Sequence, residues 1–357
     1  MKIAQIAPLY ESVPPKYYGG TERIVSCLTE ELVRQGHEVT LFASGDSVTS
    51  AKLAPVCEQA LRLNPDYADH ILYHVLEIEQ VAKSGEFDIA HFHLSYLHFT
   101  LARRLMTPSV TTVHGRLDLS DLVPLYREFS ETPVVSISDS QRTPLPWLNW
   151  QGTVHHGLPV NMFTLQPKPG GYLAFLGRFS PEKRIDRAIE ISRRSGIPLK
   201  IAAKIDNVDL EYYKSCVEPM LKDPLVEYVG EIGEAEKQEF LGKAYAHLFP
   251  IDWPEPFGLV MIEAMACGTP TIAFRRGSVP EVLDDGVTGF IVETIEEAVE
   301  SIGRISELSR ENCRRVFEKR FSASRMVRNY LSIYDRLQTE APSFNPTNPT
   351  ETSTLDR

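Results

Sequence analysis

Short apolar segments that end in small polar residues alternate with amphipathic segments along this chain. The run KIAQIAPL ends at Pro8, and EVTLFAS is the next such run. Between them, TERIVSCLTEELVRQGH carries Ile24, Leu28 and Leu32 at helical spacing before Gly36, which predicts an amphipathic helix. Strand-helix alternation of this kind predicts an α/β fold, with a parallel sheet covered by helices on both faces.

The same alternation starts again in the second half of the chain. The turn-rich QPKPGG separates FDIAHFHL, SVTTVHG and PVVSISDS from GYLAFLGRF, IPLKIAAKI, LVEYVGEI and AYAHLFPI. A length of 357 residues suits about two domains. We therefore expect one domain over residues 1–165, a second over 166–321, a last helix over 322–338, and a disordered tail rich in Pro, Asn and Thr over 339–357.

Charge and cysteine usage exclude several classes of protein. The 48 acidic and 37 basic residues give a formal charge of −11, which repels nucleic acid. The five scattered cysteines predict neither a disulfide framework nor a zinc site, and favour the cytoplasm. We expect no membrane-spanning helix. The apolar stretch PLPWLNW (144–150) offers either a packed satellite cluster or a weak peripheral contact with a membrane or bulky acceptor.

The string EPFGLVMIEAMACGTP carries two carboxylates beside a helix start. Pro256 keeps Glu255 extended, on the loop before the helix, and Glu263 lies inside the helix. The backbone N–H groups of Phe257, Gly258 and Leu259 would then lie at the helix N-terminus, where unpaired donors bind phosphate. Carboxylates repel phosphate but accept hydrogen bonds from sugar hydroxyls. The alternative is an ordinary solvated Glu255 and a salt-bridged Glu263.

The string GRFSPEKRID follows a predicted strand, so it falls at the carboxyl edge of the sheet, where α/β folds bind ligands. Arg178 and Lys183 lie five residues apart and could converge on a diphosphate, Arg as a planar fork and Lys as a point charge. The alternative pairs Lys183 with nearby carboxylates in solvent. The helix is predicted from Pro181 to Ser195.

Three further features are compatible with a site but also with a structural role. Gly19 and Gly20 precede the first helix and leave room for a phosphate or sugar, or form a tight turn. His114 ends a strand and could bond a sugar or polarise a reacting group. His91 and His93 share one strand face, which suits a metal pair, although no third ligand follows in the sequence.

Taken together, these strings resemble glycosyltransferase family 4, the retaining nucleotide-sugar enzymes of the GT-B fold. The resemblance covers residues 1 to about 335. It rests on YYGGTERIV, TTVHG, VSISDSQR, VHHGLPVNMF, LGRFSPEKRID, EPFGLVMIEAMACGTPTIAF and GSVPEVLDDGVTGFIV. It implies two Rossmann-like domains that face each other across a cleft, an acceptor-side domain followed by a donor-side domain. It also implies that the last helix crosses back to the first domain.

The resemblance also implies roles for the candidate residues. Arg178 and Lys183 would bind the donor diphosphate, and Glu263 the ribose hydroxyls. Glu255 and the backbone of residues 257–259 would hold the donor sugar, with His114 beside it. Gly19 and Gly20 would flank the diphosphate. Glu231 and Ile232 would lie against the base.

The reaction implied is front-face displacement with retention, in which the leaving diphosphate oxygen accepts the proton of the acceptor. A UDP-sugar or GDP-sugar is the expected donor, and a sugar, a lipid-linked sugar or a small molecule the acceptor. Neither a metal nor another cofactor is expected. The alternatives are a nucleotide-sugar epimerase or phosphorylase of the same fold, or a non-catalytic nucleotide-sugar-binding module.

Overall fold

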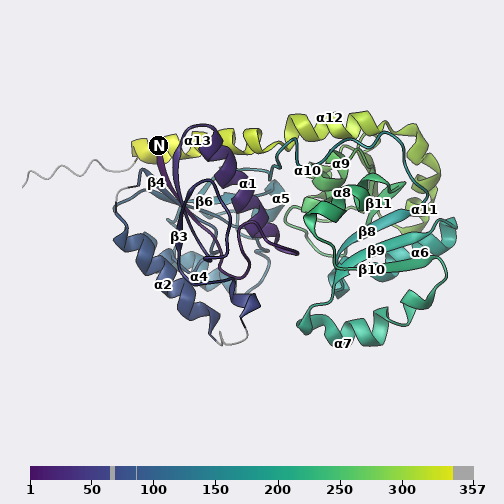
Figure 1. Cartoon of the computed structure of the whole chain (residues 1–357), viewed down its shortest axis with the longest axis horizontal. Helices are drawn as coiled ribbons and strands as arrows, with labels where there is room; N and C mark the ends of the chain where they lie inside the picture. The colour runs from purple at the N-terminus through teal and green to yellow at the C-terminus, as the bar shows by residue number, and fades with distance from the viewer. Residues whose placement is uncertain (65–68, 86, 341–357) are drawn as a thin grey trace, which may run out of the picture.

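The computed structural model describes residues 1–64, 69–85 and 87–340, and these residues form two α/β domains, each built on a parallel sheet (Figure 1). The first sheet has seven strands in the order β3-β2-β1-β4-β5-β6-β7, and the second has six in the order β10-β9-β8-β11-β12-β13. In both sheets the order reverses beside the first strand, which leaves a crevice at the carboxyl ends of the strands. The expected pair of parallel-sheet domains is confirmed.

The strands of the first sheet are β1 Lys2–Ile6, β2 Glu38–Ala43, β3 Lys52–Pro55, β4 Ile89–Phe92, β5 Ser109–Thr112, β6 Val134–Ser136 and β7 Trp150–Thr153. The helices of this domain are α1 Gly20–Arg34, α2 His70–Lys83, α3 Phe99–Ala102, α4 Leu122–Glu128 and α5 Asp139–Arg142. Strand β4 is buried along its whole length, as expected for a parallel strand covered on both faces.

The strands of the second sheet are β8 Leu173–Arg178, β9 Leu199–Lys204, β10 Val226–Gly230, β11 Ala246–Phe249, β12 Thr271–Phe274 and β13 Gly289–Val292. The helices that follow are α6 Ile185–Ser195, α7 Leu210–Tyr212, α8 Glu234–Gly242, α9 Leu259–Ala266, α10 Val279–Val282, α11 Ile295–Arg304, α12 Arg310–Arg320 and α13 Ala323–Glu340. Gly289 has no room for a side chain, because an added Cβ would lie 1.9 Å from the Thr271 carbonyl oxygen on the neighbouring strand.

The helix predicted from Pro181 is split in two. Pro181–Lys183 is a 3-10 turn, and α6 begins only at Ile185. Arg184 separates the two pieces with a left-handed backbone (φ 53°). Its guanidinium is bonded to Asp186 and to Asp252 from the loop after β11. We attribute the break to these bonds, because they stabilise the left-handed backbone of Arg184, which non-glycine residues otherwise avoid.

Two arginines of α12 hold the interdomain linker against the second domain. The Arg310 guanidinium is buried and donates to the carbonyl oxygens of Gln166, Gly242 and Ala244 and to the Thr269 hydroxyl, at 2.6–3.1 Å. One turn later, Arg314 donates to the carbonyl oxygens of Val160, Phe163 and Ala266. Because these carbonyl oxygens take no part in the regular hydrogen bonding of helices or sheets, the two arginine side chains supply the N–H donors that they would otherwise lack.

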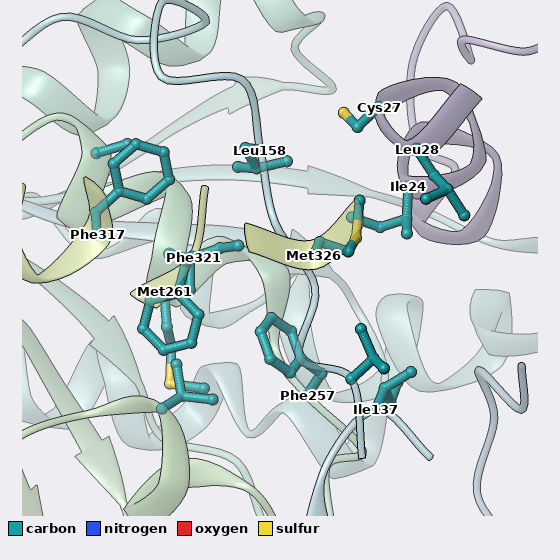
Figure 2. Packing of buried hydrophobic residues seen from close by; sticks show 14 of the residues in the cluster. Ile24, Cys27, Leu28, Ile137, Leu158, Phe257, Met261, Phe317, Phe321 and Met326 are labelled. Atoms are coloured by element: carbon teal, nitrogen blue, oxygen red, sulfur yellow. The ribbon is translucent and has the colours of Figure 1, made fainter. Parts of the chain in front are cut away.

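Helix α13 leaves the second domain and packs along α1 of the first, as the resemblance implied (Figure 1). Met326 of α13 and Ile24 of α1 belong to one buried cluster that continues into the second domain through Phe257 and Phe321 (Figure 2). The Phe257 and Phe321 rings are 6.1 Å apart and nearly perpendicular. The two domains therefore share one apolar core, and α13 is part of it.

Residues 341–357, most of the predicted tail, lie outside the described residues, and residues 339 and 340 are the last two of α13. Among the helices of residues 1–64, 69–85 and 87–340, none combines the length and apolarity that a bilayer crossing requires. In the stretch 144–150, Leu145 and Leu148 are buried in a satellite cluster and Trp147 is exposed.

Candidate functional site

A cavity of about 690 Å³ lies between the two domains, at the carboxyl ends of both sheets. Its walls combine residues of the loops after β1, β4 and β5 with residues of the loops after β8, β10 and β11. Eleven of the twelve predicted site residues line it: Gly19, Gly20, His114, Lys183, Glu231, Ile232, Glu255, Phe257, Gly258, Leu259 and Glu263. The fold therefore gathers residues from distant parts of the sequence at one place.

Lys183 and Glu255 form an ion pair in the wall of this cavity. The Lys183 Nζ atom lies 2.5 Å from Glu255 Oε2, and both side chains are largely buried. The indole N–H of Trp253 donates to the same carboxylate oxygen at 3.0 Å. The ammonium also lies 5.0 Å from the centroid of the Trp253 ring. The pair places one cation and one carboxylate side by side, where a phosphate and a sugar hydroxyl could be bound together.

Glu263 is also ion-paired, with a residue that sequence reasoning missed. Lys237 of α8 places its Nζ atom 2.6 Å from Glu263 Oε1, and Glu263 is 3% exposed. Lys237 lines the cavity as well. No spacing in the sequence pointed to Lys237, because it is a single basic residue in an acidic helix and its partner lies on a different helix.

Helix α9 opens toward the cavity, and its N-cap residue is a glycine, which has no side chain to cap the first turn. Gly258, the residue before it, has φ 80°, a conformation that favours glycine. An added Cβ there would lie 2.7 Å from Met261 Cε and 3.1 Å from the Phe249 ring. The free N–H groups and the helix dipole make this end electropositive.

A second helix N-terminus faces the first from the opposite domain. Gly20 begins α1, also without a side-chain cap. A Cβ added to Gly20 would lie 3.4 Å from Leu259 Cδ1 of α9. Two helix N-termini thus meet at one cavity that also holds the Lys183 ammonium. This arrangement suits a ligand with more than one negative charge.

Contacts between the domains close the cavity on the α1 side. The Tyr18 backbone N–H donates to Glu231 Oε1 at 3.3 Å, and Arg23 of α1 pairs with Glu234 of α8. Away from the cavity lining, Glu281 of α10 accepts hydrogen bonds at 2.7 Å from the backbone N–H groups of Asp139 and Ser140, where α5 begins. Direct bonds therefore join the two domains, and those of Tyr18 and Arg23 border the cavity.

Arg178 is not among the cavity-lining residues. Its guanidinium donates to Glu182 at 2.7 Å and lies 3.5 Å from Asp209. Burial alone would lower the pKa of Arg178, but the hydrogen bond and charge of Glu182 raise it. The diphosphate-binding role of Arg178 stays a prediction, and it requires the side chain to leave these carboxylates.

Three buried histidines near the carboxyl ends of β4 and β5 form hydrogen bonds with one another and with uncharged groups. His114 Nε2 lies 2.8 Å from His93 Nδ1, and His91 is bonded to Thr112 and to Tyr334 of α13. Burial lowers the pKa of His114 to about 3, so its ring is neutral at physiological pH. Within the part of the chain that the structure describes, no three His, Cys, Asp or Glu side chains are arranged to hold a metal ion.

Glu22, in the first turn of α1, is a second cavity residue that sequence reasoning missed. The side chain lines the cavity, and burial raises its pKa to about 7. No pattern in the sequence indicates this burial, because an acidic residue in the first turn of a helix is ordinarily solvated.

The raised pKa of Glu22 makes a testable contribution to stability. An unfolded glutamate ionises near pH 4.3. As the pH rises from about 4 to 7, the unfolded chain releases this proton while the folded chain keeps it, so the free energy of unfolding falls and then stays lower. We expect Glu22→Gln to raise that free energy by up to about 3 kcal/mol at pH 8 and to leave it unchanged at pH 4. Chemical denaturation at the two pH values measures this.

The control for this substitution is Glu79→Gln on α2, where the carboxylate is 58% exposed and pairs with Lys83. It should change the free energy of unfolding by no more than about 0.5 kcal/mol at either pH. An equal gain from Glu22→Gln at both pH values would contradict an effect of ionisation.

Two family models match this chain, one in each domain. Glycosyltransferase Family 4 matches residues 18–148, and Glycosyl transferases group 1 matches residues 163–320. Together they include the β5, β8 and β11 loops that form the cavity.

Individual relatives match over different shares of the chain. Phosphatidyl-myo-inositol mannosyltransferase of Mycolicibacterium smegmatis is 26% identical over 330 residues, which cover 82% of this chain and 81% of that protein. The probable sucrose-phosphate synthase of Thermosipho melanesiensis is 40% identical over 94 residues, and the match spans 25% of this chain and 22% of that protein.

Solved structures share the architecture. Anabaena Alr3699/HepE, solved in complex with UDP and glucose, superposes with a TM-score of 0.73 at 16% identity, over 94% of this chain and 100% of that one. At this level of identity the likeness shows the fold, and the GT-B arrangement expected from the sequence is confirmed.

Proposed function

Because the chain belongs to the glycosyltransferases, with a Family 4 match in its first domain and a group 1 match in its second, we propose that it moves a hexosyl group from a nucleoside-diphosphate sugar to an acceptor hydroxyl, with retention of configuration. The observation that carries this proposal is the convergence of two helix N-termini and Lys183 on a cavity that also contains Glu255 and Glu263. Such a cavity offers donors for a diphosphate and acceptors for sugar hydroxyls.

Each part of the donor has a matching part of the wall. The diphosphate would lie between Gly20 and Leu259, where the ammonium of Lys183 reaches it. Glu255 would accept hydrogen bonds from the hexose, and Glu263 from the ribose. The backbone after β10, at residues 230–232, would border the base. A UDP-sugar is the default donor. Support comes from Anabaena Alr3699/HepE, a fold neighbour whose structure holds UDP and glucose.

In the reaction, the bond between C1 of the hexose and the β-phosphate oxygen breaks, and a bond from C1 to the acceptor oxygen forms on the same face. The acceptor proton passes to the leaving phosphate oxygen. Lys183 and the α9 N-terminus stabilise the charge that develops there, which is the electrostatic contribution expected to dominate in such a site. His114 is a weak base, because burial lowers its pKa to about 3; its proposed role is therefore to bind rather than to remove the proton.

Donor binding is the first test. The thermal transition of the purified protein should rise with one class among UDP-, GDP- and ADP-sugars, and equally with and without a chelator, since we propose a reaction that needs no metal. Incubation of UDP-glucose without an acceptor separates the alternatives: accumulation of an epimer would indicate an epimerase. Binding without any turnover across sugar, lipid-linked and small-molecule acceptors would indicate a non-catalytic module. No shift with any nucleotide sugar would contradict the proposed donor site.

Glu263→Gln tests the ribose contact. We expect donor affinity to fall about 10- to 100-fold, because an ionised acceptor of a hydroxyl hydrogen bond is replaced by a neutral one. Titration with the nucleotide sugar that passes the first test measures it. Glu239→Gln is the matched control, because Glu239 lies on α8, pairs with Lys243 and is 72% exposed on its side chain. Equal affinities for the Glu263→Gln variant and the unaltered protein would contradict the assignment.

A further inference from the structure

A chain of buried hydrogen bonds runs from the cavity to the crossing helix. His114 Nε2 lies 2.8 Å from His93 Nδ1, and His93 Nε2 lies 2.9 Å from Gln5 Oε1. Gln5 Nε2 donates to the Tyr334 hydroxyl at 3.2 Å. That hydroxyl lies 2.6 Å from Nδ1 of His91. The chain thus joins β5, β4 and β1 of the first domain to α13.

Gln5 sets the direction of every bond in this chain. Its amide oxygen can only accept a hydrogen bond, so His93 must donate to it from Nε2. A neutral imidazole carries one proton, and burial keeps the pKa of His93 well below its usual range. His93 Nδ1 therefore accepts, and the proton between the two rings belongs to Nε2 of His114.

The second nitrogen of His114 is left with a free lone pair. Its Nε2 proton is used by His93, so Nδ1 carries no proton and can only accept. This atom is buried and has no hydrogen-bond partner within residues 1–64, 69–85 and 87–340. The same side chain lines the cavity. A buried, unpaired polar atom on a side chain that lines a cavity calls for a partner, and a ligand in the cavity can supply the missing hydrogen bond.

We propose that Tyr334 of α13, acting through Gln5 and His93, holds His114 in the tautomer whose Nδ1 accepts a hydrogen bond from a hydroxyl of the bound sugar. Gln5, His93 and Tyr334 are positioning residues in this arrangement. His114 then selects a hydroxyl-bearing group and rejects a phosphate or carbonyl oxygen, since two acceptors cannot bond each other. The identity of the ligand as a sugar rests on the proposed function, whereas the tautomer does not.

The opposite direction is less favourable. It requires the Gln5 amide to be rotated so that its oxygen and nitrogen exchange places. Each donor in the series of hydrogen bonds from Tyr334 to His114 then becomes an acceptor. His114 would then carry its proton on Nδ1, and that N–H would be buried without an acceptor. A buried N–H without an acceptor is rarer in folded proteins than a buried acceptor without a donor.

The test is nitrogen NMR of the full-length protein labelled with ¹⁵N-histidine, with the His114 signals identified by their loss in His114→Asn. At pH 7 the unaltered protein should show His114 protonated at Nε2 and unprotonated at Nδ1. Protonation at Nδ1 overturns the proposal. This measurement needs no variant of the chain other than the one used for assignment.

Tyr334→Phe and Tyr330→Phe form a matched pair that tests the role of α13. Both remove one buried hydroxyl from α13. The Tyr330 hydroxyl, however, is bonded to Thr112 at 2.9 Å and makes none of the hydrogen bonds that link Tyr334 to His114. Tyr334→Phe should introduce the Nδ1-protonated form of His114, and Tyr330→Phe should not. Identical His114 signals in all three proteins would overturn the role of Tyr334, even where the tautomer is as proposed.

A ligand measurement separates this proposal from the proposed function. Saturation with UDP-glucose should shift the Nδ1 resonance of His114 in the unaltered protein, and its 6-deoxy and other monodeoxy analogues identify the hydroxyl by loss of that shift. If UDP-glucose binds and no analogue alters the shift, the hydroxyl contact is wrong. If no nucleotide sugar binds, the proposed function fails, while the tautomer of the free protein is still decided by the NMR measurement.

Discussion

Lys183→Ala should lower kcat about 10²- to 10³-fold once a donor and acceptor are in hand, the loss typical of removing one group that stabilises developing charge. Lys183 is the cation that borders the cavity at the α9 N-terminus, and its Nζ atom lies 2.5 Å from Glu255. Without it, the negative charge on the leaving diphosphate is met by backbone N–H groups alone. Steady-state rates at saturating donor measure the effect.

The thermal transition should change little in this variant. Glu255 keeps the hydrogen bond from the Trp253 indole at 3.0 Å and borders a cavity that water can enter. Lys243→Ala is the matched control, because Lys243 is more than half exposed and pairs with Glu239 one turn away; its kcat should equal that of the unaltered protein. A Lys183→Ala variant that unfolds would show that the pair serves stability. A folded variant that retains full turnover would contradict the catalytic role of Lys183.

Arg310→Ala should cost about 3–5 kcal/mol in the free energy of unfolding of the second domain, the upper range for a single substitution. The guanidinium donates to three carbonyl oxygens and to the Thr269 hydroxyl, and the side chain is 6% exposed. Its removal leaves these buried acceptors without the guanidinium donors. Each acceptor that water cannot reach then lowers the free energy of unfolding by about 1–3 kcal/mol. Denaturant titration with a fluorescence readout measures the loss.

Arg315→Ala provides the comparison. Arg315 lies on the same helix, is exposed and donates to the Asn312 side chain, so we expect a change within about 0.5 kcal/mol. Arg310→Lys should recover part of the stability at most, because one ammonium cannot reproduce the planar fork of five donors. Equal stabilities of Arg310→Ala and Arg315→Ala would contradict the role of Arg310 as a clamp on the linker.

The elements that local pattern controls were predictable from the sequence. The helix α1 follows from the spacing of Ile24, Leu28 and Leu32, which are all buried. The loop and helix around Glu255 and Glu263 follow from Pro256 and Gly258, because each restricts or frees the backbone in a known way. Both features depend on residues that are close in the sequence.

Features that depend on distant partners could not be predicted in this way. Spacing alone predicts that Arg178 lies with Lys183, but Asp209, on another loop, shares its guanidinium with Glu182. Lys237 meets Glu263 across two helices, and Gln5 meets Tyr334 across 329 positions. Periodicity describes which face of an element is apolar, and it contains no information on which polar side chains meet across elements.

The place of α13 also has a consequence for synthesis on the ribosome. The apolar stripe of α13 completes the core around α1, yet it is translated only after the whole second domain. A nascent first domain therefore exposes the α1 face that Met326 later covers, and its buried His91 lacks the Tyr334 hydroxyl. Domains usually fold in the order in which they emerge. Here the first domain to emerge is the last to be completed, so its uncovered groove is the surface that a chaperone would have to protect during translation.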